Sequence, residues 1–217
     1  MTTELNWHLR CDQRTFEACR ANPKFPYIVA LARAVNALNF VHSAMIHAGE
    51  GDAPEASRDR INSYFFASAI LYEGMNLIRV MNQTFKDDDM FQNGLRPFLR
   101  DKVAQTITET HLNPARNGVV FHFLPERFAE TIRSASCDNC IFVSGRGDKK
   151  KDLYYDFADV VAAEILVGYA SDSEEFYEAL GQAMAGTRDL VIRFAHAAEL
   201  LISHHLKQWG FEFVTSS

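Results

Sequence analysis

Several features that often reveal a protein's function are missing from this sequence of 217 residues. No uninterrupted apolar run approaches the roughly 18 to 20 residues that span a bilayer, and the N-terminal stretch "MTTELNWHLRCDQRTFEACR" is too charged for a secretory signal. The net charge of −6 disfavours a general nucleic-acid binder, because such proteins neutralise phosphates with clustered Lys and Arg, but it permits a local basic cleft. We therefore expect a cytoplasmic protein with no membrane partner.

Cysteine is also scarce. The four cysteines are Cys11, Cys19, Cys137 and Cys140, and without a secretory signal we expect free thiols rather than disulfides. The pair in "CDNC" is the only CxxC, whereas a structural zinc site needs a second pair or added histidines at ligand spacing. We expect no metal and no cofactor, and whether Cys137 and Cys140 bind a metal stays open.

The motifs of several enzyme classes are absent as well. No GxxxxGK[ST] occurs, since "SGRGDKKK" places its glycines and lysines at other spacings, which disfavours a P-loop. The lack of a GxSxG motif disfavours the nucleophile elbow of hydrolases. A di-iron bundle needs two ExxH pairs on facing helices, and the nearest match, "HAAE", has the reverse order.

The chain does contain apolar residues at three- and four-residue steps, which is the period of a helix with one buried face. This pattern predicts an all-α helical bundle of about six or seven helices in a single domain, 1–217. A Gly- and Lys-rich turn between β-prone runs predicts a small β-hairpin, or a loop, near 140–155. The helices are expected at 25–48, 57–84, 89–112, 113–125, 156–168 and 173–209.

Three of these helices carry signals that predict where they begin or break. Asn113 followed by Pro114 predicts a helix start, because Asn caps exposed amides and Pro fits the first helical position. Pro97 predicts an irregular early part of the preceding helix. In the last helix, Gly181 and Gly186 are candidate break points.

Glu73 is the only charged residue between Arg60 and Arg79. An unpaired carboxylate that faces a core is costly, so Glu73 either turns to solvent or finds a cation. Arg116 is the partner that we expect first, and it would make Glu73 a supporting residue of any site built around that arginine.

The segment "NPARNGVVFHF" places Arg116, Asn117 and His122 inside an otherwise apolar stretch. Histidine exchanges protons near neutral pH, arginine holds a phosphate with a planar fork, and asparagine orients either group. On an ideal helix the step from Arg116 to His122 turns through about 600°, which leaves the two side chains about 120° apart. They converge only if the first turn is distorted or a second subunit completes the site.

The residues "RNGVVFH", Arg116 to His122, resemble the Rx4-6H signature of HEPN domains (higher eukaryotes and prokaryotes nucleotide-binding). The resemblance covers a core of about 25–128 and leaves helices at 156–209 as additions. It implies a dimeric all-α fold and a metal-independent endoribonuclease that acts as a toxin or phage-defence effector on RNA. Arg116 and His122 would be catalytic, Asn117 supporting, and an antitoxin or regulatory protein a further partner.

Two alternatives remain beside the endoribonuclease. The same polar residues suit a non-catalytic helical module that binds a nucleotide or a protein. They also suit a purely structural protein in which Glu73 and Arg116 tie two helices together and His122 is an ordinary helix residue.

Overall fold

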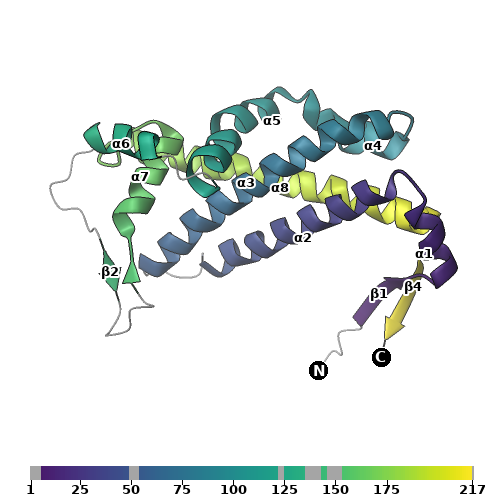
Figure 1. The fold of residues 1–217 in the computed structure, drawn as a ribbon. Helices are drawn as coiled ribbons and strands as arrows, with labels where there is room; N and C mark the ends of the chain where they lie inside the picture. Colours follow the sequence, from purple (N-terminus) through teal and green to yellow (C-terminus); the bar gives the residue numbers. More distant parts are fainter. Residues whose placement is uncertain (1–5, 49–53, 122–124, 135–142, 146–152, 217) are drawn as a thin grey trace.

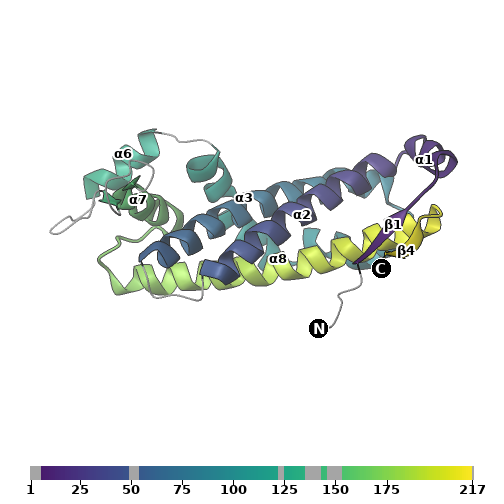
Figure 2. The same cartoon turned by 90° about the horizontal axis from the view of Figure 1, so that it is seen from below.

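A computed structural model describes residues 6–48, 54–121, 125–134, 143–145 and 153–216 and shows an all-α helical bundle, as expected from the sequence. Three long helices run along the molecule: α2 (Phe25–Ala48), α3 (Pro54–Thr84) and α8 (Glu174–Gln208). Figures 1 and 2 show that α3 and α2 are antiparallel and that α8 lies beside both. The C-terminal helix is therefore part of the central bundle and not an appendage to it.

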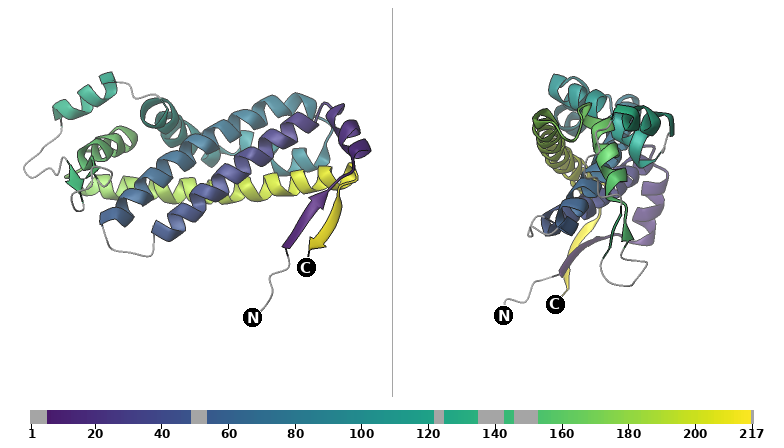
Figure 3. Two further views of the ribbon diagram at one scale, coloured as in Figure 1. Left: turned by 60° about the horizontal axis from the view of Figure 1, so that its bottom comes forward. Right: turned by 90° about the vertical axis from the view of Figure 1, so that its left-hand side faces the viewer.

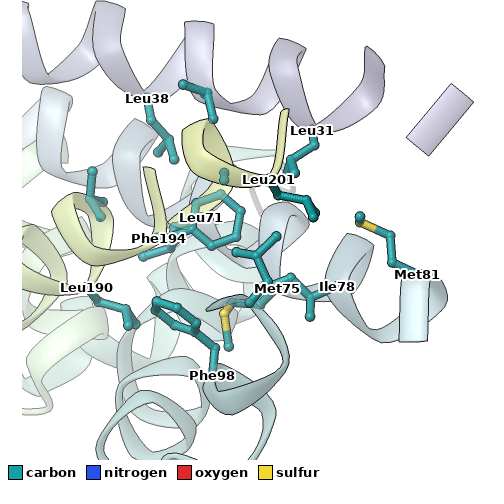
Figure 4. Close-up of a cluster of buried hydrophobic side chains, with 14 of the residues drawn as sticks. Leu31, Leu38, Leu71, Met75, Ile78, Met81, Phe98, Leu190, Phe194 and Leu201 are labelled. Atoms are coloured by element: carbon teal, nitrogen blue, oxygen red, sulfur yellow. The ribbon is translucent and has the colours of Figure 1, made fainter. Parts of the chain in front are cut away.

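The core of the bundle lies where these three helices meet. Each large aliphatic or aromatic side chain that is buried stabilises the fold by roughly 1.5 to 3 kcal/mol. Along α2 the buried residues recur at steps of three and four, as the sequence predicted. Figure 4 shows how the three helices contribute to one cluster, whose members include Leu31, Leu38, Leu71, Met75, Ile78, Leu190, Phe194 and Leu201.

Among the described residues, one segment, Phe25–Ile46 in α2, is long and apolar enough by composition to cross a membrane. It is not an uninterrupted apolar run, because Arg33 and His42 lie within it. Its Ile28 and Leu38 are almost fully buried in the bundle core, which is the environment of a core helix.

The expected single helix at 89–112 is divided into shorter pieces. These are α4 (Asp89–Gly94), the 3-10 helix η1 (Arg96–Leu99), α5 (Lys102–Ile107) and the π-helix η2 (Thr108–Leu112). Pro97 lies in the first turn of η1, where the sequence predicted an irregularity. Asp101 then starts α5, because its carboxylate accepts from the N–H groups of Val103 and Ala104.

The helix start predicted at Asn113 is wrong. Asn113 and Pro114 both have right-handed helical backbone angles, and the chain continues from η2 into a second π-helix, η3 (Ala115–Val120). A proline inside a regular helix removes a hydrogen bond and collides with the carbonyl one turn back. The wider π turns on both sides of Pro114 relieve this conflict, so the helix passes through the proline and does not begin there.

A smaller pair of helices lies at one end of the bundle (Figures 1 and 3). Here α6 (Pro125–Ser134) packs against α7 (Asp156–Val167), which ends in a left-handed Gly168 with φ +76°. The hairpin predicted near 140–155 is present as β2 (Ser144–Gly145) paired antiparallel with β3 (Leu153–Tyr154).

The opposite end of the bundle is closed by the two ends of the described chain. Strand β1 (Asn6–Arg10) pairs antiparallel with β4 (Glu212–Ser216), and α1 (Gln13–Arg20) connects β1 to α2. No sequence signal predicted this ladder. The last long helix is also unbroken, since α8 continues through both Gly181 and Gly186.

A buried ionic cluster stands at the same end. Asp88, only 7 % exposed, starts α4 and accepts a 2.6 Å hydrogen bond from Nζ of Lys24 in the α1–α2 connection. His205 of α8 places Nε2 2.9 Å from the same carboxylate oxygen, as an electrostatic contact without straight hydrogen-bond geometry. The His205 ring stacks on Trp209 at a centroid distance of 5.1 Å. The cluster therefore connects the start of α2, the start of α4 and the end of α8.

Candidate functional site

The candidate site is built on η3 where that segment lies against α3. Nε of Arg116 donates a 2.8 Å hydrogen bond to Oε1 of Glu73, so the partner expected from the sequence is the partner observed. The pair is not buried, since the two side chains are 31 % and 50 % exposed. Exposed ion pairs contribute about 0 to 1 kcal/mol, so this contact orients Arg116 more than it stabilises the fold.

Asn117 extends this contact into a chain of polar side chains. Its Oδ1 accepts a 2.6 Å hydrogen bond from Nη1 of Arg116, and its Nδ2 donates to Oδ1 of Asn113. Asn113, which was predicted to cap a helix, instead accepts a hydrogen bond from the side-chain amide of Asn117. The same amide group accepts a hydrogen bond from Arg116. The guanidinium also lies 6.0 Å from the ring centroid of Phe121, at the outer range of a cation–π contact. Arg116 is thus fixed on several sides while remaining partly accessible to solvent.

Gly74, the residue after Glu73, lies where α3 approaches α8. A Cβ atom at Gly74 would lie 2.7 Å from the ring of Phe194, closer than real contacts allow. A glycine is therefore needed for α3 to approach α8 this closely. On the other side, Ala115 and Val119 of η3 are buried, so the π-helix presents small and branched side chains inward and Arg116 outward.

Sequence reasoning missed one cation near this site. A Cβ atom at Gly118 would lie 3.1 Å from Nη1 of Arg127, so the Arg127 side chain of α6 rests against the backbone beside Asn117. Within the described part of the chain, Arg127 has no carboxylate partner, and it is exposed. The signal in the sequence was the glycine of "RNG", because a residue without a side chain lets another group approach the backbone closely.

His122 lies outside the described residues, so its position relative to Arg116 is not assigned. The same holds for Cys137 and Cys140. Of the other cysteines, Cys11 and Cys19 are free thiols, as expected. The structure thus brings together Glu73, Arg116 and Asn117 from the expected set.

A pocket of about 450 Å³ opens between α6 and α7. Arg127, Glu130 and Thr131 line one side of it, and Glu164 and Tyr169 line the other. Glu164 is only 6 % exposed, and its Oε1 accepts a 2.7 Å hydrogen bond from the N–H of Ser171. In the sequence, Glu164 lies within the apolar run "DVVAAEILVG", just as Glu73 lies within an apolar segment.

Comparison with protein-family models, with curated proteins and with solved structures finds no match to this chain.

Proposed function

We propose that this protein is a cytoplasmic, metal-independent endoribonuclease of the HEPN type that acts as a homodimer. The observation that carries the proposal is the arrangement of Arg116, which is accessible and held by Glu73 and Asn117 six positions before His122. An arginine fixed by a carboxylate and an amide is preorganised to receive a phosphate without a further conformational cost.

In this proposal Arg116 binds a non-bridging oxygen of the scissile phosphate and stabilises the negative charge of the phosphorane-like transition state. His122 takes the proton of the ribose 2′-hydroxyl, whose oxygen then attacks phosphorus. The bond from phosphorus to the 5′-oxygen breaks, and the partner subunit's His122 returns a proton to that oxygen. The products are a 2′,3′-cyclic phosphate and a 5′-hydroxyl. Asn117 keeps Arg116 aligned during the reaction.

The biological setting that fits such an activity is a toxin or phage-defence effector, held inactive by an antitoxin or regulatory protein. The acidic net charge of −6 disfavours an extended basic surface, and it permits a local basic site for the substrate.

The test is cleavage of single-stranded RNA in the presence of EDTA. Arg116→Ala and His122→Ala should each reduce the rate by about a hundred-fold or more, the scale for loss of one transition-state contact. Arg100→Ala, an exposed arginine of the same chain, is the matched control and should cleave like the wild type. Circular dichroism and sedimentation should show unchanged helicity and oligomeric state. Cleavage that persists in both site variants would refute the proposal.

The Glu73–Arg116 pair favours a second candidate, a non-catalytic module that binds a nucleotide or a protein, because an arginine already held by a carboxylate is also a stable binding group. That function would give ligand-dependent thermal stabilisation that Arg116→Ala removes, with no RNA turnover by the wild type.

A further inference from the structure

The pocket between α6 and α7 contains a carboxylate whose charge is poorly compensated. Glu164 is 94 % buried and lies in the last turn of α7, where the negative end of the helix dipole adds to the cost of a negative charge. The described residues give it one hydrogen bond, from the N–H of Ser171, and no cation. Its second oxygen, Oε2, has no partner in the described part of the chain. A buried carboxylate in this state favours a ligand that donates hydrogen bonds.

The other walls of the pocket carry groups of complementary kinds. Tyr169 is about half exposed at the rim and offers an aromatic face. Arg127 stands on the opposite side and also contacts the backbone of Gly118, next to Asn117. Arg127 thus lines the pocket and also approaches η3, the segment that carries Arg116. The volume of about 450 Å³ lies in the range of roughly 300 to 1,000 Å³ typical of small-molecule sites.

We infer that this pocket binds a guanine base of the RNA substrate, with the attached phosphate on Arg127. This inference rests on the proposed function, since it assigns the base specificity of the same site. Unpaired bases in RNA are recognised by stacking on aromatic side chains and by hydrogen bonds to their Watson–Crick edges. Tyr169 would supply the stacking face, and Glu164 the hydrogen-bond acceptors.

Guanine follows from the hydrogen-bonding capacity of Glu164. A carboxylate only accepts hydrogen bonds, and Oε1 keeps a lone pair beside the one used by Ser171. Guanine presents two adjacent donors, N1–H and the 2-amino group, which match the two oxygens. Adenine and cytosine each present one amino group beside a ring nitrogen that is itself an acceptor. That nitrogen would face a carboxylate lone pair, so both bases are disfavoured.

The first test uses 5′-GMP as the probe, with AMP and CMP at the same concentrations, in isothermal titration calorimetry on the full chain. GMP should bind at least about ten-fold more tightly than the other two nucleotides. Glu164→Gln should weaken GMP binding by on the order of ten- to a hundred-fold. The amide oxygen of this variant still accepts from Ser171, so its thermal stability should stay close to that of the wild type. Equal affinity of the Glu164→Gln variant for GMP would overturn the inference.

Two further variants separate the parts of the pocket. Glu130→Gln is the matched control, because it changes an exposed carboxylate of the same pocket, and it should alter GMP affinity less than three-fold, on the order expected of a rim charge. Arg127→Gln should weaken GMP but leave guanosine, which lacks the phosphate, unchanged. Equal loss for both ligands would overturn the assignment of the phosphate to Arg127.

Failure here can be told apart from failure of the proposed function. If GMP binds as described but RNA is not cleaved, the endoribonuclease is refuted while the guanine pocket stands. If RNA is cleaved with no preference for sites next to guanine, or if GMP does not bind at millimolar concentration, the pocket is refuted and the endoribonuclease stands. Under both proposals, Glu164→Gln should lose the preference for cleavage next to guanine.

Discussion

Replacing Asp88 with Asn is the sharpest test of the buried ionic cluster. The change keeps the cap of α4, because Asn accepts from the Phe91 N–H as Asp88 does. It removes the charge that compensates Lys24 at 2.6 Å. Removing one partner of a buried ion pair costs about 3 to 5 kcal/mol. Because the Lys24 side chain is still 29 % exposed and partly hydrated, we expect roughly 2 to 4 kcal/mol for this variant.

Urea denaturation followed by circular dichroism measures this loss of free energy of unfolding directly. In thermal denaturation, the melting temperature should fall by roughly 5 to 15 °C. The matched control is Asp87→Asn, one residue away, where the side chain is 88 % exposed and lies 3.9 Å from Lys86. The control should stay within about 0.5 kcal/mol of the wild type. If Asp88→Asn and Asp87→Asn are equally stable, the cluster does not hold the bundle together.

The same cluster predicts how stability depends on pH. Burial of the His205 ring lowers its pKa despite the attraction of Asp88, so the folded protein binds fewer protons there than the unfolded chain. Stability should therefore fall as the pH drops below about 6.5, where unfolded histidine gains its proton. Burial alone would raise the pKa of Asp88, but the Lys24 hydrogen bond, the Phe91 N–H and the nearby cations lower it overall. A second loss should follow below about pH 4, and Asp88→Asn should show a smaller one. A wild-type profile that is flat from pH 8 to 5 would contradict the first step.

Three further predictions concern other positions. Gly74→Ala should destabilise the protein by about 1 to 3 kcal/mol in urea denaturation, because its Cβ would lie 2.7 Å from a buried phenylalanine ring of α8; a neutral effect would show that the helices separate freely. Glu73→Gln and Arg116→Gln should each cost less than about 1 kcal/mol, and the double variant should cost less than their sum; losses of several kcal/mol would identify a structural tie. Burial and the neighbouring Cys11 raise the pKa of the Cys19 thiol, so iodoacetamide labelling read by mass spectrometry should modify Cys11 before Cys19.

The parts of the fold that could be predicted from sequence are those set by local periodicity. The long helices α2 and α8 were predicted because their apolar residues repeat at the helical period over many turns. The cap signal at Asn113 failed because local preference was overridden by the π-helical path through Pro114. The β1–β4 ladder was not predicted, because strand pairing between positions as distant as Asn6 and Ser216 leaves no local pattern.

Some contacts of the candidate site could likewise be predicted from the sequence, and others could not. The ion pair of Glu73 and Arg116 was predictable, since a lone carboxylate in an apolar run needs a cation as its partner. The position of Arg127 was not predictable, because its approach to Gly118 depends on how α6 folds back. A glycine in the sequence does not indicate which residue packs against it. Glu164 carried the same signal as Glu73, but its bonding partner is a backbone N–H, which no side-chain pattern reveals.

The ladder between β1 and β4 has a consequence for synthesis on the ribosome. Residues 6–10 are synthesised some two hundred residues before their pairing partner, residues 212–216. During that interval β1 exposes unpaired N–H and C=O groups, which are a template for pairing with other chains. Expression yield should therefore respond more to sequence changes in 6–10 than the short length of that strand would suggest.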